Sequence, residues 1–342
     1  STVKSLDMTL AIDDANNNTN NATWQTLTSM PEARQSHTQS TVLINNTPHV
    51  IISGGWDSSN NNKFSTVKSL DMTLAIDDAN NNTNNATWQT LTSMSETRRN
   101  HAQSAVTINN TPHIVISGGR ESNSNRLSTV ISLDVTNSTA AWQTLTPMPE
   151  TRERHTQSTA LINNTPHVIV SGGWDGRNTL STVKSLDMTL AIDDANNNTN
   201  NATWQTLAPM PETRQSHIQS TIILNNTPHV IVSGGWDGNN NNTLSTVERL
   251  DISTATNTDA TWQSMISLGN VRLVGSDGVD ILGTTVVTPG DYGGSSGATT
   301  FNSANGLSVT PGQDIPITVS TNGAARIIWG PNYSVPNNMP TS

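Results

Sequence analysis

The sequence predicts an all-β protein built from tandem units of four strands each. Two observations carry this prediction: long segments recur along the chain, and each segment alternates short apolar runs with Asn-, Gly- and Pro-rich turns. Residues 1–30 and 65–94 are identical, which indicates a recent duplication. Only 12% of the 342 residues are charged and 32% are hydrophobic, so amide and hydroxyl groups supply most of the polarity.

Every unit contains the same segments in the same order. In the first full unit we expect strands at 37–44, 49–53, 65–72 and 87–91, and a turn at the Asn-Asn-Thr-Pro sequence between the first two. The second strand ends at Gly54-Gly55, where a Cβ would clash or φ must be positive. Residues 56–63 and 75–86 are predicted as loops, and no helix is expected.

Four strands per repeat without a helix is typical of the blade of a β-propeller. Four complete blades begin near Pro31, Ser95, Pro149 and Pro211, and residues 1–27 supply the outer two strands of another. This partial blade has two explanations. Either residues from Val271 complete it as a fifth blade, or the sequence is a piece of a longer propeller.

The repeated motifs resemble those of kelch proteins over residues 1–268. The shared order is R-x-x-H, an apolar strand ending in Gly-Gly, V-x-x-L-D, and W-x-x-L-x-x-M-P. In the first unit the resemblance is carried by Arg34, His37, Gly54, Gly55, Asp71, Trp88 and Met94. It implies a kelch-like β-propeller as the first domain.

Residues 269–342 form a second region, rich in Gly, Ser and Thr. Short β-branched runs predict a small β-rich module there. Its ending, GAARIIWGPNYSVP, resembles the ends of Gly-rich structural proteins of tailed phages, notably marine ones. This resemblance implies a role in assembly or attachment.

Composition excludes several classes of function. The net charge is −10 and no basic cluster exists, so nucleic acid is not an expected partner. No apolar run approaches the roughly 18 residues of a membrane-spanning helix. The absence of Cys excludes disulfides, thiolate metal sites and cysteine nucleophiles.

Candidate ligand-binding residues gather on one side of the predicted propeller. Face A is the side that carries the segment after each Gly-Gly and each P-E-x-R-x-x-H sequence. Indole rings stack on sugars, and short polar side chains bind hydroxyl groups. The alternative is structural: Trp packs across blades and Arg ties one blade to the next. The candidates are Trp56, Asp57, Trp174, Asp175, Trp236, Asp237 and Arg120.

No metal, cofactor or catalytic site is predicted. The eight His recur at fixed repeat positions, which would spread them around a ring and not around one metal ion. The pairs Asp13-Asp14, Asp77-Asp78 and Asp193-Asp194 could bind Ca²⁺, but a solvated loop is the favoured interpretation. No asymmetric set of catalytic groups is evident.

We therefore expect a non-enzymatic structural and adhesive subunit of a virion or another extracellular appendage. Its partners would be a surface glycan or receptor, copies of itself, and other subunits contacted through the C-terminal segment. Two alternatives stay open: a kelch-type enzyme acting on sugars, similar to a sialate mutarotase, and an intracellular kelch scaffold that binds proteins.

Overall fold

The computed structural model describes residues 2–17, 21–253, 260–265, 273–275 and 317–319. Contacts divide the chain into two units. The first comprises residues 1–5, 24–244 and 248–262, and the second comprises residues 6–23, 245–247 and 263–342. Apart from residues 247 and 263–264, the blade strands belong to the first unit.

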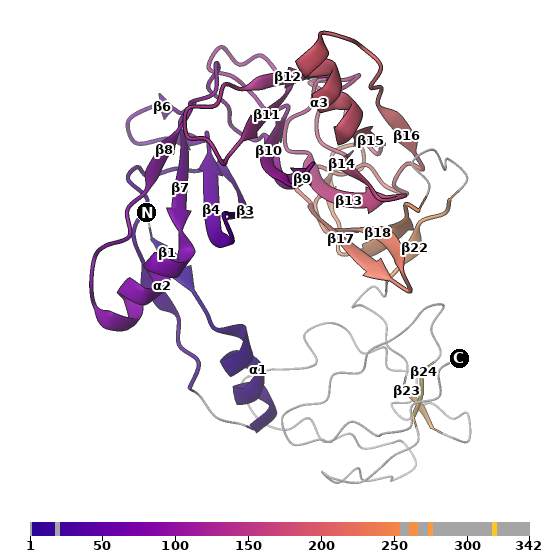
Figure 1. The fold of residues 1–342 in the computed structure, drawn as a ribbon. Helices are drawn as coiled ribbons and strands as arrows, with labels where there is room; N and C mark the ends of the chain where they lie inside the picture. Colours follow the sequence, from indigo (N-terminus) through magenta and orange to yellow (C-terminus); the bar gives the residue numbers. More distant parts are fainter. Residues whose placement is uncertain (1, 18–20, 254–259, 266–272, 276–316, 320–342) are drawn as a thin grey trace. The chain divides into compact units, whose positions relative to one another are not determined.

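Four four-stranded antiparallel sheets confirm the predicted blades (Figure 1). In every blade each strand pairs with the next blade strand in the sequence. In blades 1 and 4 a short extra hairpin is inserted between the second and third strands. Blade 1 consists of β3 (Thr38–Ile44), β4 (Thr47–Ser53), β7 (Val67–Asp71) and β8 (Gln89–Leu91), and blade 2 of β9 (Ala102–Ile108), β10 (Thr111–Ser117), β11 (Val130–Asp134) and β12 (Gln143–Leu145). Blade 3 consists of β13 (Thr156–Ile162), β14 (Thr165–Ser171), β15 (Val183–Asp187) and β16 (Gln205–Leu207), and blade 4 of β17 (Ile218–Leu224), β18 (Thr227–Ser233), β21 (Val247–Asp251) and β22 (Gln263–Ser264).

The partial blade is present, and no closing strands are seen among the described residues. Strand β1 (Val3–Ser5) pairs with β2 (Gln25–Leu27) in a two-stranded sheet. The expected completion from Val271 is not found there, because β23 (Leu273–Gly275) pairs with β24 (Ile317–Val319) instead. The rest of the predicted C-terminal module lies outside the described residues, so the boundary at 268 stays a prediction.

Two-residue turns connect the first two strands of each blade. Ile44 pairs with Thr47 across Asn45 and Asn46, whose φ angles are 50° and 63°. Two successive residues with positive φ match the twist of a hairpin, and Asn tolerates this backbone region. Pro48 lies inside β4 and not in the turn. Its missing backbone N–H leaves no hydrogen bond unmade, because β7 ends opposite His49 and does not reach residue 48.

The hydrophobic core lies between neighbouring sheets. Strand β9 contacts both β3 and β13, and β13 contacts β17. Between blades 1 and 2, for example, Ile51 and Val67 share one buried cluster with Ile114 and Leu133. Each blade therefore buries its apolar side chains only when another blade covers them.

A polar network recurs at each of the three junctions between blades. At the junction of blades 2 and 3, Ser117 Oγ lies 2.8 Å from Nε2 of His155 and donates to Oε1 of Gln157 at 2.5 Å. Gln157 Nε2 in turn donates to Ser104 Oγ and to the Val115 carbonyl. The other two junctions repeat this arrangement with Ser53, His101 and Gln103, and with Ser171, His217 and Gln219.

The paired glycines are required where one blade meets the next. Gly118 and Gly119 have φ angles of 55° and 94°, and Gly119 N–H donates to the Arg152 carbonyl at 2.7 Å. A Cβ on Gly118 would lie 2.4 Å from that carbonyl oxygen, a distance real Cβ atoms do not reach. Both reasons expected from the sequence, crowding and positive φ, therefore apply.

The loops predicted after the third strand are wrong in blades 1 and 3. Those segments form helices, α2 (Met72–Asn81) and α3 (Met188–Asn197), and α1 (Met8–Asn17) forms from the identical sequence in the second unit. Asp71 caps α2 by accepting from Thr73 N and Leu74 N. Met72, Ala75, Ile76 and Ala79 supply an apolar stripe at helical spacing, which the Asn-rich flanks obscured.

The helices also relocate the candidate calcium residues. Asp78 is buried on α2, and its carboxylate accepts from Ala86 N, Thr83 Oγ1 and Asn85 Nδ2. These hydrogen bonds, led by that from the Ala86 amide, lower the pKa of Asp78 to about 2. Asp194 on α3 is held in the same way. The two carboxylates therefore stabilise, through these hydrogen bonds, the segment that follows each helix.

Candidate functional site

The candidate site is the inner edge of face A, which we name the face A rim. It comprises the two residues after each buried Arg, namely 35–36, 99–100, 153–154 and 215–216, and the segments after each Gly-Gly, namely 56–63, 120–126, 174–179 and 236–243. Backbone bridges join the two sets in every blade, for example Gln35 to Trp56 and Glu153 to Trp174.

A line of backbone hydrogen bonds holds the rim across the blades. Asn100 N donates to the Ser36 carbonyl at 3.0 Å, Arg154 N to the Asn100 carbonyl at 2.8 Å, and Ser216 N to the Arg154 carbonyl at 2.9 Å. These four residues have positive φ angles between 52° and 58°. The rim side chains are thus presented from a repeated, fixed backbone.

The buried Arg residues beneath the rim are structural. Arg152 is 0% exposed, and its guanidinium donates to the Gly172 carbonyl and to Thr182 Oγ1, both in its own blade. Arg34, Arg98 and Arg214 bind the equivalent glycine carbonyls. The expected link from one blade to the next is therefore made by the Arg backbone carbonyl and not by the side chain.

The three candidate tryptophans lie half-buried at the rim. Two of the segments that carry them are short hairpins and not loops, β5 (Trp56–Asp57) with β6 (Asn62–Lys63), and β19 (Trp236–Asp237) with β20 (Asn242–Thr243). The Arg99 guanidinium lies 5.0 Å from the Trp56 ring centroid, and Arg126 lies 6.0 Å from that of Trp174. Both contacts cross from one blade to a neighbour, so these indoles partly serve packing.

The three candidate aspartates are committed to their own turns. Asp57 accepts from Ser59 N and Asn60 Nδ2, and the Asn60 hydrogen bond is the main cause of its lowered pKa. Asp175 accepts from the amides of Arg177 and Asn178. Asp237 is 2% exposed and accepts from Thr213, Asn239 and Asn240. These carboxylates shape the rim more than they face solvent.

Charged residues that the sequence analysis did not single out join Arg120 in blades 2 and 3. Arg126 Nε pairs with Glu153 Oε1 at 2.8 Å, and Asn100 Nδ2 donates to Glu153 Oε2 at 3.3 Å. Arg154 is exposed, and no side-chain hydrogen bond or ion pair of this residue occurs within the described part of the chain. The signal for Glu153 and Arg154 was available, because the equivalent residues of blades 1 and 4 are Gln and Ser.

Five of the eight histidines are buried at the junctions or hydrogen-bonded to a neighbouring strand. His101, His155 and His217 are buried at the junctions, where burial lowers their pKa values, to about 3 for His101 and His217. His49 and His113 hydrogen-bond through Nδ1 to a Ser of the third strand. Over the described residues no cluster of three or more His, Asp or Glu could hold a metal ion, and no helix there is long and apolar enough to cross a membrane.

Comparisons with known proteins add no assignment. No protein-family model matches the chain, and no curated protein matches it. The structure shows an array of propeller blades, and the face A rim is its candidate site.

Proposed function

We propose that this chain is a kelch-type propeller that acts as a non-enzymatic structural and adhesive subunit of a virion or another extracellular appendage, and that its face A rim binds a surface glycan. The observation that carries the proposal is the difference between rim and interior. Junction residues repeat from blade to blade, whereas rim residues differ: the Arg99 guanidinium lies 5.0 Å from the half-buried Trp56 ring, and Arg120 and Arg154 belong to the same rim.

The rim chemistry favours a glycan that carries carboxylates. Arg binds carboxylates through paired N–H donors, and an indole offers a face for the sugar ring. Arg154 is exposed and Trp174 is half-buried in the same blade. The Asp side chains contribute less than the sequence suggested, because the turn amides already occupy them.

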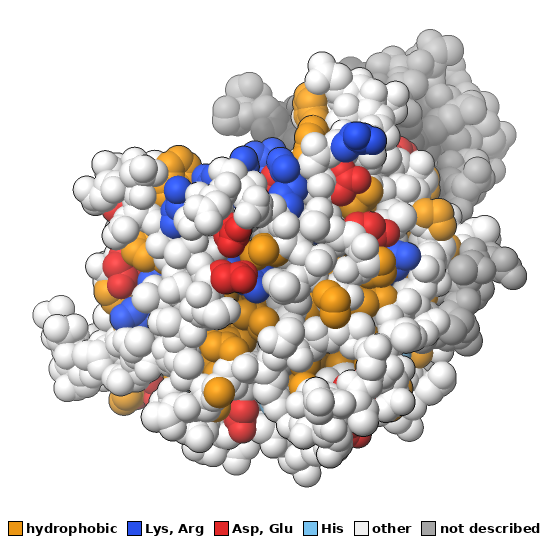
Figure 2. Space-filling model, turned by 90° about the horizontal axis from the view of Figure 1, so that it is seen from above, with side chains coloured by type: hydrophobic (Ala, Val, Ile, Leu, Met, Phe, Trp, Pro, Cys, Tyr) orange, Lys and Arg blue, Asp and Glu red, His pale blue; other side chains and the backbone are white. Residues whose placement is uncertain are grey.

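The wider surface supports adhesion without strong electrostatic steering. Figure 2 shows a face on which most groups are uncharged, with Lys and Arg side chains interspersed among Asp and Glu. Such a surface makes hydrogen bonds with little long-range attraction for charged molecules. Attachment through residues 269–342 remains part of the proposal, and nearly all of that segment lies outside the described residues.

Arg154→Ser tests the proposal with the residue that blades 1 and 4 carry at this position. On an array of acidic and neutral glycans, we expect the full chain to bind acidic glycans and Arg154→Ser to weaken that binding about tenfold, or ~1.4 kcal/mol. Trp174→Ala should weaken binding as well. Lys184→Ala is the control, because it removes one positive charge from an edge of blade 3 where Lys184 bonds Thr206. Equal losses for Arg154→Ser and Lys184→Ala, or no glycan binding, would contradict the proposal.

In the enzyme alternative, a substrate-binding arginine would have to lie on the exposed rim. Arg152 is not available for this role, because it is fully buried and holds the Gly172 carbonyl. Loss of activity in an Arg152 variant would therefore report unfolding. A sugar turned over by the purified chain, and not merely bound, is the result that would favour an enzyme.

A further inference from the structure

A pocket of about 480 Å³ lies between blade 2 and helix α3 of blade 3. It opens at the ends of the blades that carry the Asn-Asn turns, which are the opposite ends of the strands from the face A rim. Its size falls within the range of small-molecule sites. The lining residues are Ile108, Asn109, Thr111, His113, Asp134, Ala140, Ala141, Gln143, Ile192 and Asn196.

The pocket results from unequal copies of the repeat. In blade 2, residues 135–142 join β11 to β12 without a helix, whereas blade 3 has α3 at the equivalent place. Helix α3 contacts β12 of blade 2, and Gln143 Nε2 donates to Asn196 Oδ1 at 2.6 Å. A short connection and a helix from the following blade therefore meet here, so this site lacks the repeat symmetry of the histidine positions.

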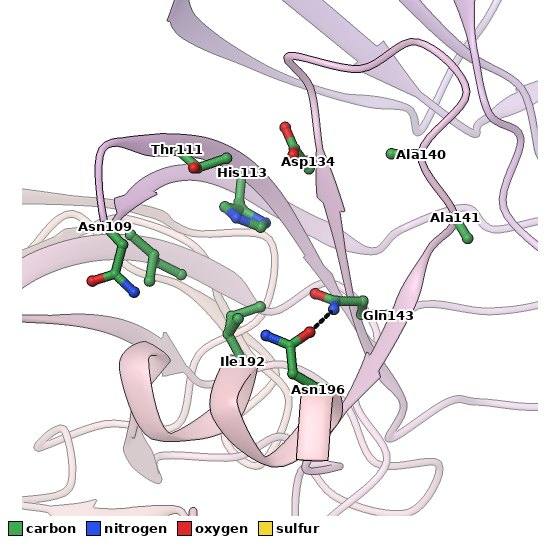
Figure 3. A pocket seen from close by; sticks show the side chains of 10 residues that line it. Asn109, Thr111, His113, Asp134, Ala140, Ala141, Gln143, Ile192 and Asn196 are labelled. Carbon is green, nitrogen blue, oxygen red and sulfur yellow. Dashed lines mark hydrogen bonds between the residues drawn. The ribbon is translucent and has the colours of Figure 1, made fainter. Parts of the chain in front are cut away.

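Polar groups line one part of the pocket. Figure 3 shows the imidazole of His113 between Thr111 and Asp134, with the hydrogen-bonded Gln143 and Asn196 side chains across from it. His113 Nδ1 lies 3.1 Å from Ser132 Oγ, which leaves Nε2 for a ligand. Burial lowers the pKa of His113 against the opposing effect of Asp134, so the ring is neutral near pH 7.

Apart from Asn109, the remaining lining is apolar, and it contains no Lys or Arg. Ile108 and Ile192 are 3% and 7% exposed, and Ala140 and Ala141 complete this side. Asp134 uses Oδ1 to accept from the Thr136 amide and hydroxyl, and Oδ2 makes no hydrogen bond within the described residues. An anionic ligand would face this carboxylate without a compensating Lys or Arg.

We propose that this pocket binds a neutral monosaccharide unit. The C–H face of the sugar ring packs on Ile108 and Ile192, and its hydroxyl groups bond to His113, Asp134 and the Gln143–Asn196 pair. Neutral donors and acceptors beside an apolar surface match adjacent hydroxyl groups on an apolar ring. The site is independent of the face A rim, so either proposal can fail without the other.

Saturation-transfer NMR and calorimetry on the full chain test this site, with D-glucose, D-galactose, D-mannose, D-glucuronate and D-glucosamine as probes. We expect at least one neutral hexose to bind. Ala141→Trp fills the pocket from an exposed position and should weaken that binding at least about tenfold. Thr203→Trp is the matched control, because Thr203 is the equivalent exposed residue of blade 3. It should bind as the original chain does.

A second pair of variants distinguishes binding in the pocket from an effect of the Gln–Asn contact that both α2 and α3 make. Asn196→Ala removes a lining amide and should weaken the hexose affinity. Asn80→Ala removes the equivalent amide of α2, which accepts from Gln25 at 2.6 Å, and should leave the affinity unchanged. The proposal is overturned if no neutral hexose binds, if glucuronate or glucosamine binds in preference, or if Ala141→Trp binds as well as Thr203→Trp.

Discussion

The three junctions between blades and the two outer faces of the array carry the same side chains in different surroundings. At the junction of blades 2 and 3, Ser117 is 0% exposed and binds His155 and Gln157. On the outer face of blade 4, the equivalent Ser233 is partly exposed, and on that of blade 1, Gln39 is exposed. Burial and hydrogen bonding are therefore properties of the junction and not of the repeated sequence.

The apolar residues show the same contrast. Ile218 on β17 is 71% exposed, whereas Ala102, which holds the equivalent place at a junction, is 5% exposed. Blade faces of this kind are stable when another sheet covers them. The comparison predicts that identical substitutions have unequal effects at the junctions and at the outer faces.

The largest difference is expected for the first glycine of each pair. Gly118→Ala puts a Cβ against the Arg152 carbonyl, whereas at Gly234 the nearest atom is the Leu244 carbonyl oxygen at 3.5 Å. We expect the free energy of unfolding to fall by about 3 kcal/mol for Gly118→Ala and by about 1 kcal/mol for Gly234→Ala, where only the positive φ is strained. Urea unfolding measures both. Equal losses of unfolding free energy in the two variants would show that Gly118 does not lie against the Arg152 carbonyl.

A smaller difference is expected for the glutamine of the network. Gln157→Leu removes the acceptor of Ser117 Oγ and the donor to the Val115 carbonyl, so we expect a loss of about 2 kcal/mol. Gln39→Leu, on the outer face of blade 1, should change stability by less than about 0.5 kcal/mol. Slower hydrogen exchange of the β10 backbone amides in Gln157→Leu than in the original chain would contradict a stabilising role of this network.

The pH dependence of stability gives the most gradual effect. The junction histidines remain neutral in the folded chain, since burial lowers the pKa of His101 and His217 from 6.5 to about 3. The unfolded chain takes up protons below about pH 6.5. Each such histidine therefore costs up to about 1.4 kcal/mol of stability per pH unit as the pH falls from about 6.5 toward 3.

Replacing one histidine isolates this effect. His217→Gln should flatten the fall in unfolding free energy between about pH 7 and about pH 5, measured by urea titration at each pH. His37→Gln should flatten it less, because His37 is only half-buried on an outer face and its pKa is lowered less completely. A slope unaffected by His217→Gln would mean that this histidine is protonated in the folded chain.

Local signals allowed much of the fold to be predicted. The four-strand order, the Asn45-Asn46 turn and the glycine pair each depend on residues close in sequence. The helices were missed because the Asn-rich context of residues 75–86 outweighed the stripe formed by Met72, Ala75, Ile76 and Ala79. That stripe becomes stabilising only when the helix packs on a neighbouring sheet, as α2 does on β2 and β4.

The candidate site was predicted in part. The sequence placed Trp56, Trp174 and Trp236 on one face, and the structure brings them to the rim together with Arg99, Arg126 and Arg154. It also assigns Asp57, Asp175 and Asp237 to turns, which composition could not show. Whether the Trp residues and Arg120 bind a ligand stays a prediction.

By itself, the sequence determined the repeated unit, its strand order and its turns, because strand alternation, left-handed Asn and glycine φ angles are encoded within a few residues. Only the tertiary structure decided which His and Ser are buried, where the helices dock and where a pocket opens. These features depend on contacts between residues about 40 to 60 positions apart, such as Ser117 with His155 and Gln143 with Asn196, and on which copy of the repeat stands beside which.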